Sequence, residues 1–402
     1  MKKVRRRAGA VLLIVALILG LTGFYVVRYA LRGAEWASFR SNGNAYVGGR
    51  LTAGTVVDRN GTVLYRVEDG TPRYAESETV RRATLHAIGD RAGNIGTGAL
   101  KMFPDEILGF SPVDGLYDLN GNGGTLTLSL DADVCAAAIN ALGDRRGAVA
   151  VMDYVTGELI CMVSSPAFDP ENPPETVDDA SGVYLNRVLS STFTPGSVYK
   201  LLTLAAAIEN IDDLFERDFH CDGALSVGAD AESSGWTVAQ SVDGIGCAAG
   251  RYDVAAQDID LGWSGAGQYK DLVNPAAMLR FVAAIANHGR APRMTQLKNT
   301  TRLGVEYDRL MRPATADQIA QIMDYCVRHT YGSENFPGLA LHAKSGTAEV
   351  GSVSPNAWFV GFIDDAEHPY CFVVCIENGG WGSTEAGPVA NAVLQAAVRG
   401  EK

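Results

Sequence analysis

The sequence predicts an α+β protein: an antiparallel sheet flanked by helices, preceded by one transmembrane helix and a small β-containing juxtamembrane region. Three observations support this prediction. The chain opens with a basic cluster and a long uncharged apolar run, later apolar runs have the length and flanks of buried strands, and helical patterns lie on both sides of those runs. Hydrophobic residues make up 47% of the 402 residues and charged residues 20%, which excludes wholesale disorder and a collagen-like chain.

The N-terminal segment predicts a membrane anchor. The uncharged residues 8–27 would span about 30 Å of hydrocarbon as a helix. Basic residues crowd residues 1–7, so the positive-inside rule places that tail in the cytoplasm and the rest of the chain outside. A cleaved signal peptide is the competing interpretation, but the run exceeds a typical signal core and no small-x-small site follows within residues 22–28.

Charge divides the chain near the same place. Seven of the 34 basic residues and none of the 46 acidic residues lie within residues 1–32, so acidic groups outnumber basic ones by 19 in the remainder. An acidic body argues against nucleic acid as a partner, because phosphate binding depends on clustered Lys and Arg.

The cysteines and histidines indicate neither a disulfide scaffold nor a metal site. Seven cysteines are sparse for a chain of this length. Cys161, Cys371 and Cys375 lie in apolar runs, where a thiol packs as a small hydrophobe. Cys221 and Cys247 lie in Gly-rich sequence, where an exported chain could join them or leave them free. No His lies at metal-ligand spacing from Cys or carboxylate, so we expect no metal and no cofactor.

The residues after the anchor predict a small, irregular region that leads into stronger patterns. Asn60-Gly61 between two β-rich runs is the strongest short hairpin signal, and Asp131 is a typical helix N-cap. The expected elements are a hairpin at 54–65, a short helix at 78–88, a strand at 125–130 and a helix at 131–142.

From residue 147 the patterns indicate the main sheet and its helices. Two apolar runs joined through Thr156-Gly157 predict a hairpin of buried strands, and Asn274-Pro275 predicts a helix start. The expected strands are 148–152, 159–163, 341–349, 357–363 and 370–377, and the expected helices are 197–210, 276–287, 315–328 and 388–398.

A serine and a lysine at helical spacing form the first candidate site. Pro195-Gly196 ends the preceding chain, so Ser197 falls in the first turn of the next helix and Lys200 lies beside it on the same face. A serine nucleophile needs a base, and a lysine is a base only when neutral; burial, a helix N-terminus and a second cation all favour that form. An N-capping Ser with an exposed Lys is the alternative.

The second candidate lies on a predicted strand in the C-terminal half. Lys344 would supply positive potential, the hydroxyls of Ser345 and Thr347 would bind a substrate carboxylate, and Gly346 permits a ligand to approach the backbone. The backbone N–H groups of Thr347 and Ser197 would form a pair of donors for an oxyanion. A polar strand edge is the alternative, but the order of the two motifs in an exported chain favours a site.

With these motifs the chain resembles a class B penicillin-binding protein, in the short form that lacks a large pedestal domain. The resemblance covers most of residues 50–400 and implies a fold like that of serine β-lactamases and penicillin-binding transpeptidases. The other matching stretches are 54–61, 147–149, 156–157, 164–170, 186–187, 284–289 and 357–362. The expected segments are a cytoplasmic tail at 1–7, a transmembrane anchor at 8–27, a juxtamembrane or linker region at 28–122 and a transpeptidase domain at 123–402.

The resemblance implies a D,D-transpeptidase of peptidoglycan synthesis. Ser197 would attack the carbonyl between two D-Ala residues of a stem peptide, Lys200 would be the general base, and residues 344–347 would bind the substrate. It also implies a single-pass cell-membrane protein with an extracytoplasmic catalytic domain, acylation by β-lactam antibiotics, and a membrane glycosyltransferase partner in cell growth and shape, division or sporulation.

One expected element is missing. A Ser-x-Asn motif, whose serine relays protons and whose Asn binds the substrate amide, should precede the helix at Asn274. Ser241-Val242-Asp243 is the nearest substitute, and Ser233-Ser234-Gly235 is a weaker one. Loss of a proton relay costs on the order of 10² to 10⁴ in rate. The alternative function is therefore a catalytically degenerate relative that binds muropeptide or acts as a structural partner in cell-wall synthesis.

Overall fold

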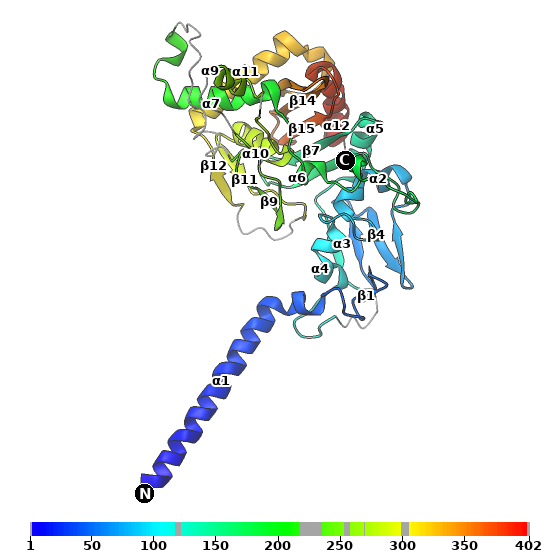
Figure 1. Ribbon diagram of the computed structural model, residues 1–402, viewed down its shortest axis with the longest axis vertical. Helices are drawn as coiled ribbons and strands as arrows, with labels where there is room; N and C mark the ends of the chain where they lie inside the picture. The colour runs from blue at the N-terminus through cyan, green and yellow to red at the C-terminus, as the bar shows by residue number, and fades with distance from the viewer. Residues whose placement is uncertain are drawn as a thin grey trace. The chain divides into compact units, whose positions relative to one another are not determined.

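The computed structural model describes residues 2–116, 122–217, 235–252, 258–268, 270–298 and 305–399. By its internal contacts the chain divides into two compact units (Figure 1). Unit 1 consists of Met1–Val56, Tyr65–Arg73 and Phe103–Leu126, and unit 2 consists of Val57–Leu64, Tyr74–Met102 and Thr127–Lys402.

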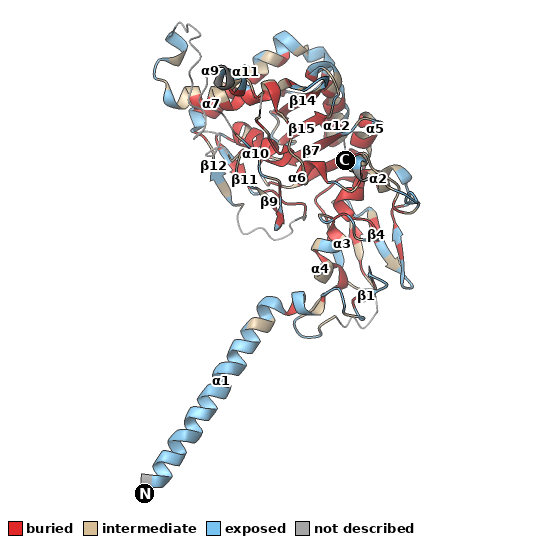
Figure 2. Cartoon of the chain, in the orientation of Figure 1, coloured by how far each residue is buried: buried red, intermediate tan, exposed pale blue. Residues whose placement is uncertain are grey.

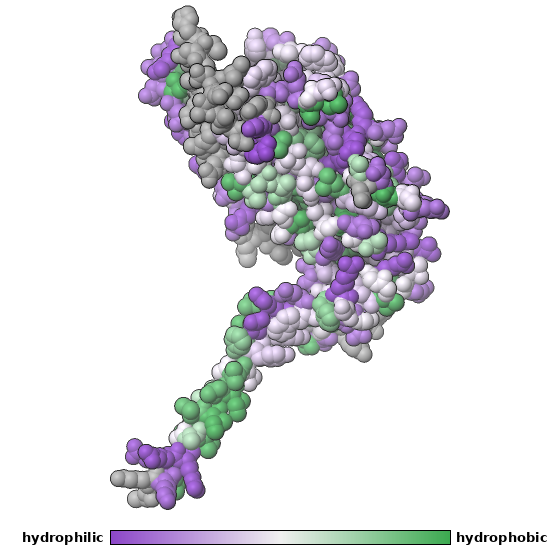
Figure 3. Space-filling view, viewed as in Figure 1, coloured by the Kyte–Doolittle hydropathy of each residue, from purple (hydrophilic) through white to green (hydrophobic). Residues whose placement is uncertain are grey.

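Unit 1 begins with helix α1, Lys2–Ala37, which contains the predicted anchor. Within the described ranges it is the one helix long and apolar enough to cross a membrane, and its apolar stretch is not buried in the protein (Figure 2). Figure 3 shows apolar side chains along the helix beyond its polar N-terminal end. Its 36 residues measure about 54 Å, so the helix extends beyond the roughly 30 Å that a hydrocarbon core requires.

The predicted hairpin at Asn60-Gly61 is confirmed. Strands β3 and β4 are neighbours in a four-stranded sheet of order β5-β4-β3-β6. Asp58 shapes the turn, because its Oδ1 accepts hydrogen bonds from the N–H groups of Asn60 (2.9 Å) and Thr62 (2.7 Å). The strands are β3 Thr55–Val57, β4 Val63–Glu68, β5 Thr71–Tyr74 and β6 Thr125–Thr127; a separate short pair is β1 Tyr46–Val47 and β2 Arg50–Leu51.

Strand β6 is shorter than the predicted 125–130 strand. The N–H of Leu128 still bonds Val57 O at 2.9 Å, but the N–H of Ser129 turns away and donates to Gln296 O at 2.7 Å. A change of hydrogen-bond partner within an alternating stretch leaves no mark in the sequence.

Unit 2 is built on a five-stranded antiparallel sheet of order β13-β14-β15-β7-β8. Its strands are β7 Gly147–Asp153, β8 Leu159–Ser165, β13 Leu341–Val350, β14 Val353–Ile363 and β15 Tyr370–Ile376. The inner strands are buried almost throughout (Figure 2), as their continuous apolar runs predict. The thiols of Cys161, Cys371 and Cys375 are fully buried there, as expected. The predicted α+β sheet is confirmed, and β13 forms one of its edges.

Helices cover both faces of this sheet (Figure 1). Helix α5 packs on β8 and α12 on β15, whereas α10 packs on β7, β14 and β15 from the other side, next to α11. Asp131 caps α5 through a side-chain oxygen, as expected, and α10 starts at Pro275, where Asn274 supplies a cap of the same kind. The main helices are α2 Glu78–Ile88, α5 Ala132–Leu142, α7 Lys200–Asn210, α9 Asp258–Gly265, α10 Pro275–Ala286, α11 Pro313–Cys326 and α12 Gly387–Arg399; shorter ones are α3 Ala99–Met102, α4 Pro104–Leu108 and α6 Arg187–Ser190.

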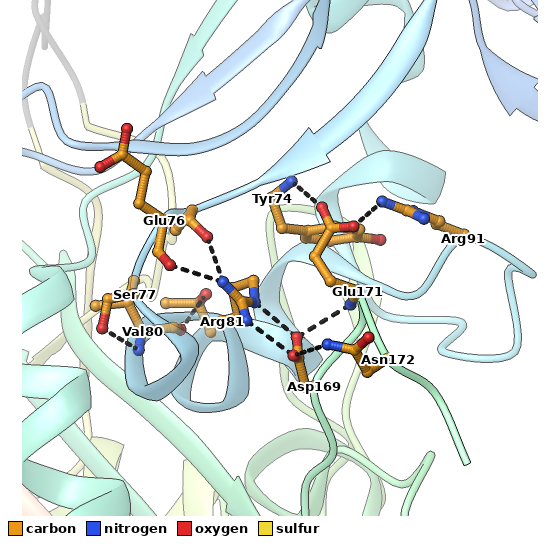
Figure 4. Close-up of polar contacts among 11 residues, drawn as sticks. Tyr74, Glu76, Ser77, Val80, Arg81, Arg91, Asp169, Glu171 and Asn172 are labelled. Carbon is orange, nitrogen blue, oxygen red and sulfur yellow. Dashed lines mark hydrogen bonds and ion pairs between the residues drawn. The ribbon is translucent and has the colours of Figure 1, made fainter.

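A cluster of opposite charges ties α2 to the segment after β8 (Figure 4). Arg81 donates two hydrogen bonds to Asp169, from Nε at 2.6 Å and from Nη2 at 2.8 Å, and both side chains are nearly buried. These bonds hold the pKa of Asp169 at about 2. Glu171 accepts from the N–H of Tyr74 at 2.8 Å and pairs with Arg91. We call these five residues the Arg81 cluster.

Candidate active site

Ser197 lies on a tight turn ahead of a helix. The 3₁₀ turn η2 covers Gly196–Tyr199 and α7 begins at Lys200, so the expected helix from residue 197 starts three residues later. Gly196 has a φ of 58°, which favours glycine, and its N–H donates to Gly267 O at 2.7 Å. Neither η2 nor α7 has a side-chain cap hydrogen bond, so Ser197 is not an N-capping residue.

The structure brings the two predicted motifs into contact, because the η2 turn rests directly on β13. A Cβ atom on Gly346 would lie 2.9 Å from Pro195 O and 3.1 Å from Val198 N. A Cβ atom on Gly196 would lie 2.6 Å from Thr347 O. Both glycines are therefore required by this packing. Val198, whose nitrogen approaches Gly346, belongs to the turn that carries Ser197.

The two lysines of the site have different environments. Lys344 is half-buried, and its Nζ donates to Ser345 O at 2.6 Å. Burial lowers the pKa of Lys344; the neighbouring charge of Lys200 lowers it further, while Cys326 acts in the opposite direction. The two lysine charges are thus close enough to interact. Lys200 is exposed, so the burial that we expected around it is not observed.

Strand β13 presents backbone groups at the edge of the sheet. The N–H of Ser345 donates to Tyr331 Oη at 2.9 Å, and Thr347 O accepts from Gln268 Nε2 at 3.3 Å. Residues two apart on a strand point the same way, so the Thr347 N–H also faces outward from β14. An outward N–H at Thr347 is what the expected oxyanion pair with Ser197 requires.

Two further contacts fix the segments around the turn. Trp358, on β14, donates from Nε1 to Thr194 O at 2.9 Å and packs edge-on against Phe193. The hydroxyl of Thr347 accepts from the N–H of Gly382, at the start of the π-helical turn η6 Gly382–Ala386, at 3.2 Å. The chain before the Ser197 turn and the chain after the sheet are thereby held to adjacent strands.

Tyr331 and Gln268 contact the site but are absent from the sequence prediction. Tyr331 ends the π-helical turn η4, Val327–Tyr331, which extends α11 beyond the expected end at residue 328. Gln268 follows α9 in a Gly-rich stretch whose turn signals predict a loop without a partner. Both contacts are tertiary, so no local pattern identifies them.

Of the proposed substitutes for Ser-x-Asn, the described one, Ser241-Val242-Asp243, makes its contacts away from the Ser197 turn. Ser241 begins the two-residue strand β9, Ser241–Val242, which pairs with β10, Ile245–Gly246, and Figure 1 draws β9 apart from α7, lower on the same side of unit 2. Asp243 Oδ2 accepts from the N–H of Gln296 at 2.7 Å. Ser241 is exposed and lines a cavity of about 550 Å³ with Arg280. Ser233 and Ser234 lie outside the described residues.

The predicted bridge between Cys221 and Cys247 also involves a residue outside the described ranges, Cys221. Cys247 is buried, and burial raises its pKa to about 12. Among the described residues, no three His, Cys, Asp or Glu side chains gather in a way that could hold a metal ion.

The family model described as the penicillin binding protein transpeptidase domain matches residues 147–244 and 216–395. The chain belongs to this family. Among curated proteins it is similar to Peptidoglycan D,D-transpeptidase PbpA of Mycobacterium tuberculosis, 25% identical over 337 residues that cover 64% of this chain and 68% of the relative. It is also similar to Peptidoglycan D,D-transpeptidase PbpA of Mycolicibacterium smegmatis, 23% identical over 444 residues, covering 90% and 89%.

Solved structures agree with this assignment. Penicillin-binding protein A from M. tuberculosis superposes with a TM-score of 0.70 at 19% identity, over 86% of this chain and 98% of that one. Pseudomonas aeruginosa PBP2 superposes with a TM-score of 0.66 at 23% identity, over 86% and 96%. The expected transpeptidase fold and the resemblance to class B penicillin-binding proteins are therefore confirmed.

Proposed function

We propose that the chain is a serine-type D,D-transpeptidase that cross-links peptidoglycan stem peptides through an acyl-enzyme on Ser197. One observation carries the proposal: the turn that holds Ser197, with Lys200 at the start of α7, rests against the edge strand that holds residues 344–347. The similar curated proteins are named peptidoglycan D,D-transpeptidases, which supports this enzyme class. Nothing in the comparisons favours the degenerate alternative.

The proposed reaction has two steps at one serine. Ser197 Oγ attacks the carbonyl between two D-Ala residues, and Lys200, as the proposed general base, accepts its proton. The N–H groups of Ser197 and Thr347 stabilise the oxyanion; the C–N bond then breaks, and D-Ala leaves with a proton. An amine of a neighbouring stem peptide then attacks the acyl ester, the ester C–O bond breaks as the cross-link forms, and the proton that the amine loses passes to Ser197 Oγ.

Substrate binding is assigned to β13. An extended stem peptide can lie beside an edge strand. On β13 the Ser345 N–H and Thr347 O already have partners, so the side chains are assigned most of the binding. We assign the terminal carboxylate to Lys344 and to the hydroxyls of Ser345 and Thr347. Gly346, which lies between these residues on the strand, allows the Ser197 turn to pack closely on β13. The half-buried ammonium of Lys344, whose pKa is lowered by burial, would gain stability from a bound anion. The same subsite would bind the carboxylate of a β-lactam.

We further propose that α1 anchors the chain in the cell membrane with residues 1–7 in the cytoplasm and the acidic body outside. The remaining expected segments are 8–27 as anchor, 28–122 as juxtamembrane region and 123–402 as transpeptidase domain. A membrane glycosyltransferase fits as a partner, because cross-linking needs newly made glycan strands nearby. A structurally similar protein, PBP2 from Helicobacter pylori, has been solved in complex with MreC, with a TM-score of 0.59 at 19% identity, over 70% of this chain and 65% of that one.

Labelling with a fluorescent penicillin tests the proposal. Wild type should acquire one covalent label, Ser197→Ala should acquire none, and Ser191→Ala, a serine on the preceding segment, should label like wild type. Absence of label on wild type after long incubation at micromolar probe would show that the nucleophile assignment is wrong. Labelling without cross-linking of a stem-peptide donor and acceptor would favour the degenerate alternative.

A further inference from the structure

We propose that Tyr331 is a positioning residue that orients the hydroxyl of Ser345 toward the substrate carboxylate. The inference rests on the proposed function, because it concerns the carboxylate end that Ser345 is assigned to bind. Tyr331 comes from η4, beyond α11, and reaches the outer edge of β13.

Tyr331 makes two hydrogen bonds to one residue. Its Oη accepts from the backbone N–H of Ser345 at 2.9 Å and lies 3.0 Å from Ser345 Oγ. The first bond satisfies an outward N–H that the edge strand would otherwise present to solvent. The second fixes the position of the Ser345 oxygen.

The bond from the Ser345 N–H to Tyr331 Oη favours one direction for the second hydrogen bond, between the two hydroxyls. A phenol that already accepts a hydrogen bond is a stronger donor through its own proton, because linked hydrogen bonds polarise one another. In the proposed arrangement Tyr331 donates to Ser345 Oγ, and the hydroxyl proton of Ser345 is left to donate to an anion. Burial raises the pKa of Tyr331, although its bonds to Ser345 lower it, so the phenol keeps this proton at neutral pH.

Packing holds the Tyr331 ring in place. Phe359 pairs with Ser345 across β13 and β14, so the two side chains share a face of the sheet. The Tyr331 ring packs edge-on against Phe359 with centroids 5.3 Å apart, and Phe336 stacks on Phe359 at 5.6 Å. Asn335 Nδ2 also donates to the carbonyl of Tyr331 at 2.7 Å. A ring held by an aromatic wall and a fixed backbone suits a positioning role.

This arrangement predicts an effect that depends on the charge of the substrate terminus. Removal of the Tyr331 hydroxyl lets the Ser345 hydroxyl rotate, which weakens one hydrogen bond to a carboxylate. A hydrogen bond to a charged group corresponds to about tenfold or more in rate. For a donor without the carboxylate, the rate of acylation should not change.

The test compares two thioester analogues of the donor stem peptide, one with a free terminal carboxylate and one with a carboxamide. A thioester is used with the detergent-solubilised protein because a thiolate is a better leaving group than an amine, so that acylation depends less on the carboxylate. In Tyr331→Phe, kcat/KM for the carboxylate donor should fall about tenfold while that for the carboxamide donor stays within twofold. Tyr325→Phe, an exposed tyrosine of α11, is the matched control and should change neither.

A double mutant shows whether Tyr331 acts through Ser345. In the Ser345→Ala background, the further change Tyr331→Phe should alter carboxylate discrimination by less than twofold. Equal losses for both donors, or an unchanged carboxylate preference in Tyr331→Phe, would overturn the inference. The proposed function would survive that result if wild type still labels with penicillin, whereas a wild type that does not label would overturn both.

Discussion

Two polar clusters of unit 2 differ in how their charges are neutralised. In the Arg81 cluster each cation faces a carboxylate, and the pairing holds the pKa of Asp169 at about 2. At the Ser197 site two lysines interact with each other, and the charge of Lys200 adds to burial in lowering the pKa of Lys344. Opposite charges stabilise the fold, whereas unneutralised like charges are a cost that is expected where an anion binds.

The largest expected effect concerns the packing of the site. Gly346→Ala places a Cβ atom 2.9 Å from Pro195 O and should move the Ser197 turn, and a displacement of about 1 Å costs about 100-fold in rate. The acylation rate with fluorescent penicillin measures this loss. Gly246→Ala is the control, because a Cβ atom there meets nothing within 4 Å; its rate should match wild type. Equal acylation rates for both variants would contradict the claim that close packing at Gly346 positions the Ser197 turn.

Replacing one cation of each cluster with Met should give opposite results. Lys344→Met should slow acylation about 10–100-fold without lowering the melting temperature, because it removes a like-charge interaction and the proposed ligand of the substrate anion. Arg81→Met should lower the free energy of unfolding by about 2 kcal/mol, a value between those of exposed and buried ion pairs, while acylation stays within about threefold. Acylation assays and thermal unfolding check both variants, and a destabilised Lys344→Met would contradict the contrast.

The Arg81 cluster should also show a pH signature. The folded pKa of Asp169 is lowered to about 2 from an ordinary value near 4, so its contribution to stability is complete above about pH 4 and is lost as pH falls toward 2. The difference in unfolding free energy between wild type and Arg81→Met, measured by denaturant titration, should therefore shrink across that window. A constant difference would show that Arg81 stabilises the fold by packing alone.

The smallest expected effect is at the β9 hairpin. Ser241→Ala should change penicillin acylation and stem-peptide cross-linking by less than twofold, because Ser241 is exposed and lies on a hairpin away from α7 (Figure 1). A loss of 10²-fold or more, the size of a proton-relay effect, would mean that the hairpin reaches the active site during turnover.

Elements with local signals could be predicted from the sequence. Helix α2 matches its expected range of 78–88, because Ser77 caps its start and Gly89 ends it. The buried strands β7, β8 and β15 follow from uninterrupted apolar runs. Contact between the Ser197 turn and β13 follows from the resemblance, whereas spacing alone predicts only that each motif lies on its own element.

Other features depend on tertiary contacts or on fine geometry. A 3₁₀ turn and the first turn of an α-helix share similar side-chain spacing, so the η2 turn at Ser197 could not be distinguished from a helix start. Tyr331 reaches Ser345 only because η4 continues α11 by one further turn. The exposure of Lys200 likewise depends on what packs beside the start of α7, which its own sequence does not specify.

The central claim is that Ser197 is the residue acylated by donor peptides and penicillins. Incubation of the full-length protein with penicillin, followed by proteolysis and mass spectrometry, measures this directly. We predict a single penicilloyl adduct on the peptide that contains Ser197, and none in Ser197→Ala. An adduct on any other residue, or no adduct on wild type, would contradict the account.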